Sequence, residues 1–164
     1  MFRKILLSSA IALSVAAPAS ADWQFTKWGM SQEDLLTVSP INIKNSRFDP
    51  ECPSTAPLSS NYEVSEFLMF TACYGFDRKS DTLNYVYLYL RDYASRGILY
   101  DSLVAKYGSP KIHDGSKGIG LAWYEWRSGN NLITLTEDRT NIQSPKMHIH
   151  YRSLQPTLET ESKL

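Results

Sequence analysis

Two histidines, His148 and His150, have the only spacing in the chain that is typical of a metal site. Because side chains alternate along a β-strand, both imidazoles would lie on one face of a predicted strand at 147–152. Protein zinc sites use three or four ligands, and nothing in the sequence brings the remaining candidates, His113 and Glu125, close to this pair. We therefore expect two solvent-facing histidines on an edge strand, with metal binding through His148 and His150 as an alternative.

Three tyrosines, Tyr85, Tyr87 and Tyr89, alternate along another predicted strand, 83–90. Tyr, Trp and Arg dominate binding hot spots, so a row of tyrosines on the solvent side predicts a recognition surface. The alternative is a structural role, since cross-strand aromatic pairs stabilise sheets by about 0.2–1 kcal/mol each. Side chains at alternate positions of each predicted strand form two sets, of which one is more aliphatic. If the more aliphatic set of each strand faces the core, the other sets form an outer face. This outer face carries Tyr85, Tyr87, Tyr89, Trp123, Thr134, Thr136, His148, His150 and Arg152.

Catalytic motifs are missing from the sequence: it has no nucleophile elbow, no phosphate loop ending in Gly-Lys-Ser/Thr and no His-Glu-x-x-His pair. Segment 114–120 contains three glycines but lies between a predicted helix and an antiparallel strand, so we expect a flexible loop. Paired acids occur only as neighbours, such as Glu33-Asp34 and Glu137-Asp138, for which capping or turn roles suffice. We expect a protein that is not an enzyme and that uses no cofactor.

The two cysteines of the chain, Cys52 and Cys73, are predicted to form a disulfide. A redox or metal pair usually shows a Cys-x-x-Cys spacing or nearby histidines, whereas here 20 residues without a histidine intervene. Closing a loop of about 22 residues would stabilise the fold by roughly 3 kcal/mol on the chain-entropy model. A disulfide also requires an oxidising compartment.

The N-terminus has the pattern of a secretory signal peptide, residues 1–21. Arg3 and Lys4 precede an apolar run at 5–17, and Ala19-Ser20-Ala21 offers small residues for cleavage before Asp22. The run is shorter than the about 20 residues of a membrane-spanning helix. The residue immediately after the cleavage site is Asp22 and not a cysteine, so no lipid anchor is expected. We predict a periplasmic or secreted protein with one domain, 22–152, and a polar tail, 153–164.

The charge of the predicted mature chain argues against two classes of partner. Of 17 basic residues, Arg3 and Lys4 fall in the signal peptide, which leaves 15 against 17 acidic residues and a formal charge near −2. Nucleic-acid binding needs a basic stripe that displaces counterions. Binding to an anionic lipid surface needs a cluster of Lys and Arg. Neither is present in the sequence.

The predicted elements alternate between strands and two helices. A capping box formed by Ser31 and Asp34 predicts the first helix, and Gly108 and Pro110 end the second. Gly129-Asn130 predicts a tight hairpin in which Arg127 pairs with Leu132. The expected order is a strand at 23–26, a helix at 32–38, an irregular segment at 40–61, strands at 64–76 and 83–90, a helix at 94–107, and strands at 121–127, 132–137 and 147–152. This order predicts an α+β two-layer sandwich, with two short helices packed on one face of an antiparallel sheet.

Two short motifs carry a resemblance to a family of exported bacterial proteins. Thr26-Lys27-Trp28-Gly29-Met30-Ser31 is followed by Glu33-Asp34, and Leu103-x-x-x-Tyr107-Gly108-x-Pro110 is followed by Trp123 or Trp126. Together they resemble the superfamily of SmpA/OmlA (BamE-like) outer-membrane assembly proteins and β-lactamase-inhibitor-protein-like (BLIP-like) domains. The resemblance implies a two-layer α/β domain in a Gram-negative envelope that acts through protein contacts, in the inhibitor branch through the exposed sheet face. BamE-like proteins are lipoproteins, whereas this chain lacks the acylated cysteine.

These observations favour a non-enzymatic periplasmic module that binds a protein or interacts with the envelope through its aromatic outer face. The expected partner is a periplasmic or outer-membrane protein, whose identity the sequence does not give. One alternative is a metal-binding envelope protein or enzyme that uses His148 and His150. Another is a binder of lipid or glycan fragments, with the ligand between the sheet and segment 40–61.

Overall fold

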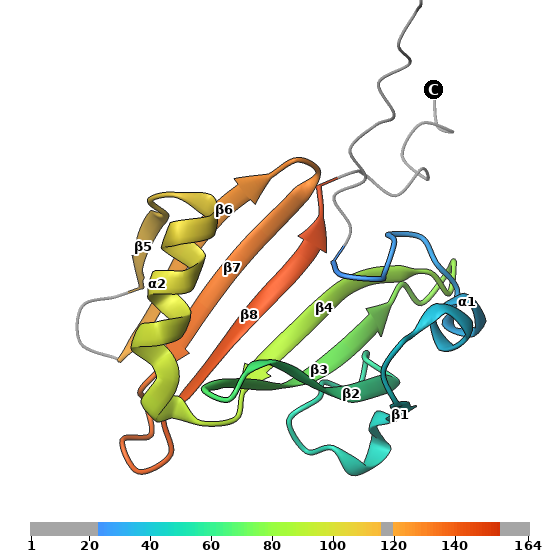
Figure 1. The fold of residues 1–164 in the computed structure, drawn as a ribbon, viewed down its shortest axis with the longest axis horizontal. Helices are drawn as coiled ribbons and strands as arrows, with labels where there is room; N and C mark the ends of the chain where they lie inside the picture. The colour runs from blue at the N-terminus through green and yellow to red at the C-terminus, as the bar shows by residue number, and fades with distance from the viewer. Residues whose placement is uncertain (1–22, 116–119, 155–164) are drawn as a thin grey trace, which may run out of the picture.

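The computed structural model describes residues 23–115 and 120–154 (Figure 1). The predicted signal peptide, residues 116–119 of the glycine-containing segment and residues 155–164 of the predicted tail lie outside the described residues. Within the two described ranges, no helix is long and apolar enough to cross a membrane.

The described residues form an eight-stranded antiparallel sheet with the strand order β1-β2-β3-β4-β8-β7-β6-β5. Its strands are β1 (Ile43–Asn45), β2 (Leu58–Ser65), β3 (Leu68–Phe76), β4 (Leu83–Leu90), β5 (Lys111–Gly115), β6 (Leu121–Ser128), β7 (Asn131–Asp138) and β8 (Lys146–Ser153). The helical elements are α1 (Gln32–Val38), α2 (Arg96–Tyr107) and the short 3₁₀ turns η1 (Ser46–Phe48) and η2 (Tyr93–Ser95). Strands β4 and β8 lie side by side at the centre, so the prediction that His148 and His150 lie on an edge strand is wrong.

The predicted α+β sandwich with two helices on one face is wrong, because the described protein is largely β. The only sizeable helical segment in the described ranges is the 12-residue α2 with the 3-residue η2 before it. Helix α1 has 7 residues and lies at the other end of the molecule from α2 (Figure 1). Strands β1 and β5 were not predicted because their polar sequences, IKN and KIHDG, lack the alternation of a half-buried strand.

The predicted strand at 23–26 is also wrong. The backbone N–H and the hydroxyl of Thr26 both donate to the carbonyl of Trp23, at 2.9 and 2.6 Å, which closes a turn. The turn directs the Trp23 ring into the hydrophobic core, where the residue is buried. Burial of this large ring against Tyr62 and Tyr151 outweighs the strand propensity of the local sequence.

Several local predictions are confirmed. Ser31 caps α1 by accepting from the Asp34 N–H at 3.1 Å, while Asp34 accepts from the Ser31 N–H at 3.1 Å. The pKa of the Asp34 carboxyl is lowered because its Oδ2 accepts from the Ser31 hydroxyl, at 2.8 Å, and from the Ser31 N–H. Helix α2 ends at Tyr107, with Gly108 in a positive-φ conformation. In the β6–β7 hairpin, Arg127 pairs with Leu132 as predicted.

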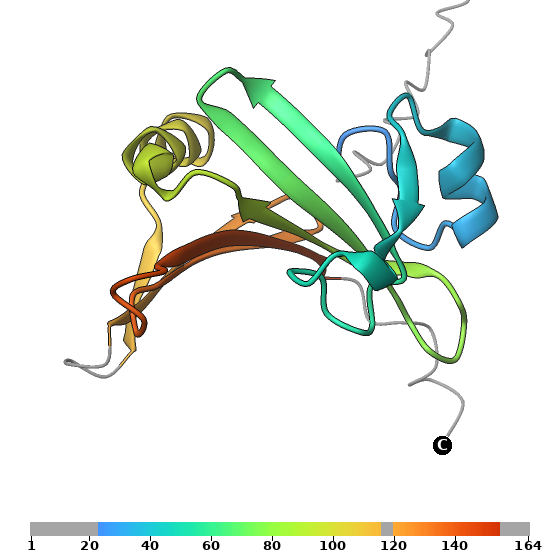
Figure 2. The same cartoon turned by 90° about the horizontal axis from the view of Figure 1, so that it is seen from below.

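The core occupies the face of the sheet on which α2 lies, and the predicted inward sets point into it. Figure 2 shows α2 on one side of this face and the β2–β3 hairpin rising on the other. Strand β8 arches beneath them, with its hollow side turned away from α2. The residues at predicted inward positions of β4, β6, β7 and β8 that are buried are Val86, Leu88, Leu90, Trp126, Ile133, Leu135, Met147, Ile149 and Tyr151.

Candidate functional site on the outer face of the sheet

The outer face is assembled by the pairing of β4, β8, β7 and β6. Tyr85, Tyr87 and Tyr89 lie directly opposite Arg152, His150 and His148. Residues directly opposite each other in an antiparallel pair share one face. On the other side of β8, His150 pairs with Thr134 and His148 pairs with Thr136, which in turn pairs with Trp123. The structure therefore brings all seven predicted binding residues onto one face.

Five of these side chains form a contiguous aromatic array: Tyr85, Tyr87, Tyr89, His148 and His150. The Tyr87 and His150 rings are stacked, with centroids 4.3 Å apart and an interplanar angle of 18°. Tyr85 meets His150 edge-on at 5.5 Å, and Tyr89 meets His148 at 5.1 Å. Each of the five residues is half-buried, so the rings shield one another and remain accessible from the outer side.

Burial disfavours the charged form of both imidazoles in the aromatic array. Burial, together with the neighbouring Arg152 and His148, lowers the pKa of His150 to about 4. Burial also lowers the pKa of His148, although the Asp138 carboxylate opposes this. Burial raises the pKa of Tyr89 to about 12. Arg152 is exposed beside the array and supplies the positive charge next to these neutral rings.

The predicted disulfide between Cys52 and Cys73 is confirmed, with a Cα–Cα distance of 5.6 Å. Cys73 lies opposite Tyr87 in the β3–β4 ladder, so the bond fastens segment 40–61 to the outer side of the sheet next to the array. In the same segment, the Thr55 hydroxyl is hydrogen-bonded to the Tyr85 hydroxyl. The disulfide segment thus fixes one border of the aromatic array.

The Tyr85 ring packs against Gly75, which has no side chain. The two residues are opposite each other in the ladder, and a Cβ added to Gly75 would lie 1.9 Å from the Tyr85 ring. The ring therefore lies directly over the glycine backbone. No sequence pattern predicts this, because the contact depends on the register of two strands.

The structure brings His113 and Glu125 together but keeps both away from His148. His113 Nε2 lies 3.8 Å from Glu125 Oε2. His113 and His148 stand in the same row of the sheet, separated by Trp123 and Thr136. Three strand spacings correspond to about 14 Å. Among the residues that the structure describes, no group of three or more His, Cys, Asp or Glu side chains could hold a metal ion.

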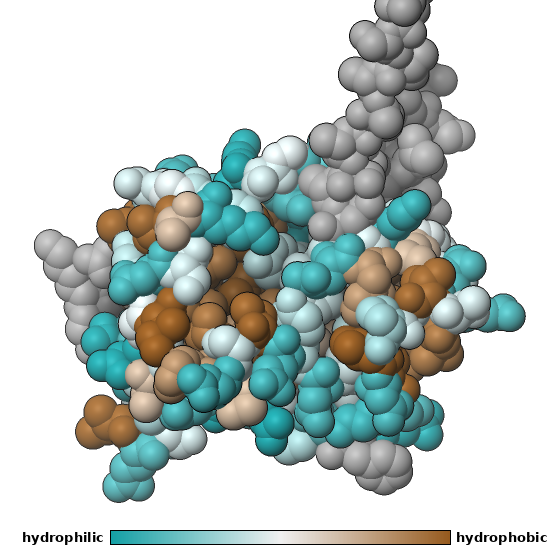
Figure 3. Space-filling view, viewed as in Figure 1, coloured by the Kyte–Doolittle hydropathy of each residue, from teal (hydrophilic) through white to brown (hydrophobic). Residues whose placement is uncertain are grey.

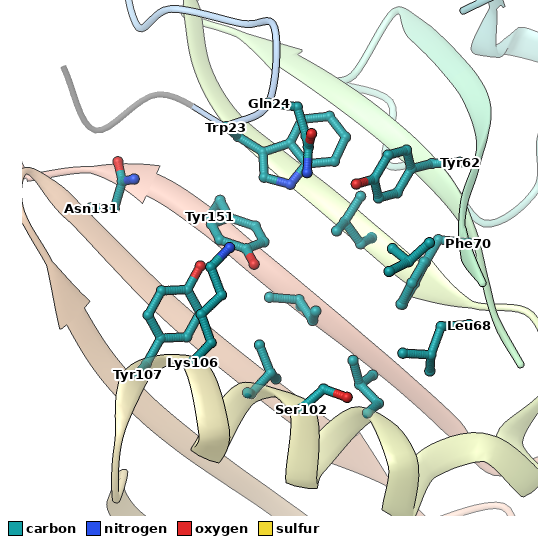
Figure 4. Close-up of a pocket in the computed structure, with 15 residues that line it drawn as sticks. Trp23, Gln24, Tyr62, Leu68, Phe70, Ser102, Lys106, Tyr107, Asn131 and Tyr151 are labelled. Carbon is teal, nitrogen blue, oxygen red and sulfur yellow. The ribbon is translucent and has the colours of Figure 1, made fainter.

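Sequence reasoning missed a cavity on the opposite side of the sheet. This apolar cleft, of about 200 Å³, lies between α2 and the β2–β3 hairpin, and Figure 4 shows the residues that line it. One alternative from the sequence is a ligand between the sheet and segment 40–61. The cavity found near that segment, of about 680 Å³, is lined by residues of the segment alone, among them Asn45, Asp49 and Pro57. The apolar cleft depends on the spacing of α2 and the β2–β3 hairpin, which no local signal encodes.

Comparison with known proteins adds no relative: no protein-family model, no curated protein and no solved structure matches this chain. The resemblance of the two short motifs to BamE-like and BLIP-like proteins therefore stays a prediction. The function has to be argued from the geometry and the chemistry of the outer face.

Proposed function

We propose that this protein is a non-enzymatic binding module of the bacterial cell envelope that contacts a partner protein or peptide through its outer face. The observation that carries the proposal is the aromatic array across β4 and β8, with Arg152 exposed beside it. Aromatic residues and Arg are enriched at the energetically dominant positions of protein interfaces. The array lies on central strands, which makes it a rigid surface.

Two physical properties make the array suited to binding. Its imidazoles are neutral because burial lowers the pKa values of His148 and His150, so covering them removes no ionised group from water. Its rings are already held by mutual contacts, such as the stacking of Tyr87 on His150. Side chains that are ordered before association lose less conformational freedom on binding.

The chemistry of the outer face favours a particular kind of partner segment. Neutral aromatic rings form favourable contacts with apolar and aromatic side chains. The guanidinium of Arg152 pairs best with a carboxylate, because two parallel hydrogen bonds can form between them. We therefore expect the partner to present an apolar or aromatic side chain next to an Asp or Glu.

The proposed location is the periplasm or the extracellular medium. The Cys52–Cys73 disulfide is compatible with an oxidising compartment. The predicted signal peptide and the motif resemblance support the same location. The proposed partner is a periplasmic or outer-membrane protein.

Affinity capture from a periplasmic extract tests the proposal. The Tyr87→Ala, Trp123→Ala and Arg152→Glu variants of the immobilised protein should each lose a partner that the wild type retains. Phe67→Ala is the matched control, because Phe67 is an exposed aromatic residue on the β2–β3 turn, outside the outer face. If the variants are folded by circular dichroism and retain every partner, the outer face has only a structural role.

A further inference from the structure

The apolar cleft lies on the face opposite the outer face, between two elements distant in sequence. Figure 3 shows apolar side chains gathered in the hollow between α2 and the β2–β3 hairpin. The cleft is lined by hydrophobic side chains from both elements and from the central strands. These include Leu68, Phe70, Leu88, Leu99, Leu103 and Ile149.

Polar groups gather on another part of the lining. In Figure 4 the Lys106 ammonium lies near the hydroxyls of Tyr107 and Tyr151, with Tyr62 across the cavity. The Tyr107 and Tyr151 side chains are hydrogen-bonded to each other, which contributes to the raised pKa of Tyr151. The Lys106 ammonium lies 5.0 Å from the centre of the Tyr107 ring, and its charge opposes the raised pKa of Tyr62.

The charge that lines the cleft is positive. Lys106 contributes a cation, and among the described residues the side chains that line the cleft include no Asp or Glu. An anion entering the cleft would therefore meet one ammonium and several hydroxyl donors without a repelling carboxylate. Since the rest of the lining is largely apolar, the complementary ligand has an anionic end and a hydrocarbon body.

From this arrangement we infer that the cleft is a second binding site, whose ligand is a medium-chain fatty acid. Its hydrocarbon chain would cover Phe70, Leu99 and the neighbouring apolar side chains, and its carboxylate would lie beside Lys106 and the tyrosine hydroxyls. The size of the cavity limits the ligand, because about 200 Å³ is only somewhat more than the about 150 Å³ that accommodates one benzene molecule. Octanoate or decanoate matches this volume better than a phospholipid does.

The inference is independent of the proposed partner on the outer face. The two sites use opposite faces of the sheet, so a failure of one leaves the other in place. Substitutions at Tyr87 or Arg152 should leave fatty-acid binding unchanged. Substitutions in the cleft should leave the capture of a partner by the outer face unchanged.

Isothermal titration calorimetry of the full chain with octanoate and decanoate tests the inference. Each additional buried methylene should tighten binding about fourfold, so decanoate should bind more tightly than octanoate. Decanol lacks the charge and should bind less tightly than decanoate, and decyltrimethylammonium should bind least. A peptide ending in Leu has the same two groups but a larger body, so it should not compete with decanoate.

Two variants with matched controls locate the ligand. Ser102 is exposed on α2 and lines the cleft, so Ser102→Phe should fill the cavity and weaken decanoate binding more than tenfold. Lys106→Met retains the aliphatic stem and should weaken binding about two- to fivefold, the range of an exposed ion pair. Asp101→Phe and Lys44→Met change exposed residues outside the cleft lining and should have no effect.

The outcomes separate clearly. Selective decanoate binding that Ser102→Phe weakens more than tenfold and Lys106→Met weakens about two- to fivefold supports the inference. It is overturned if decanoate does not bind, if decyltrimethylammonium binds equally well, or if folded Ser102→Phe protein binds like the wild type. Competition by the peptide, without selectivity for decanoate, would instead identify the cleft as a peptide site and would also overturn it.

Discussion

The clearest quantitative prediction concerns the pH dependence that His150 gives to stability. The substitution is His150→Phe, which keeps a flat ring stacked on Tyr87 and removes the titrating imidazole. His150 Nε2 is buried without a hydrogen-bond partner among the described residues, so the phenyl ring leaves no protein donor or acceptor unpaired. The groups that face His150 are the rings of Tyr85, Tyr87 and His148 and the Arg152 guanidinium.

The direction follows from the two pKa values of His150. The folded pKa is about 4, and the value without the fold is 6.5. Between these values the unfolded chain binds more protons than the folded one, so stability falls as the pH is lowered through this window. At about 1.4 kcal/mol per pKa unit, the full contribution is up to about 3 kcal/mol. This loss of stability is complete below pH 4 and absent above pH 7.

Urea unfolding of wild type and His150→Phe between pH 7.5 and pH 4 measures this contribution. The difference in the free energy of unfolding should shift by up to about 3 kcal/mol in favour of the variant as the pH falls. Tyr87→Phe is the matched control, since it alters the same stack without removing an imidazole, and its difference from wild type should stay constant. A constant difference for His150→Phe as well would refute the assignment of a buried, neutral imidazole.

Three further predictions concern the disulfide, the ring contact and the helix cap. The double variant Cys52→Ala/Cys73→Ala should lose roughly 3 kcal/mol in urea unfolding; an unchanged midpoint would show that segment 40–61 is held by other contacts. Gly75→Ala should displace the Tyr85 ring and cost about 1–3 kcal/mol, with changed Tyr85 ring signals by NMR, whereas unshifted signals would contradict the contact. Ser31→Ala should cost about 1 kcal/mol by leaving an N–H of the first turn of α1 unpaired, and a loss below about 0.3 kcal/mol would argue against the cap.

The parts of the fold that the sequence predicts are those whose signals are local. The capping box at Ser31, the positive-φ Gly108 and the Gly129-Asn130 turn each act within a few residues, and each marks an element of the structure. The alternation in 83–90 and 147–152 separated the inward from the outward sets, because a strand has only two faces. This placed the predicted binding residues on one face.

The remaining features depend on contacts between distant residues. Strands β1 and β5 form because they pair with β2 and β6, not because their own sequences favour strands. Trp23 leaves a strand-like sequence to enter the core beside Tyr62 and Tyr151. The apolar cleft arises from the spacing of α2 and the β2–β3 hairpin, so none of its residues carries a recognisable pattern.

The central claim, that the outer face is a contact surface, is tested most directly by site-specific photo-crosslinking in living bacteria. A photoreactive phenylalanine analogue replaces either Tyr87, in the aromatic array, or Phe67, on the β2–β3 turn of the opposite side. The account predicts a defined covalent adduct from position 87 that disappears when Arg152→Glu is added, and no such adduct from position 67. Equal labelling at both positions, or an adduct that Arg152→Glu leaves unchanged, would contradict it.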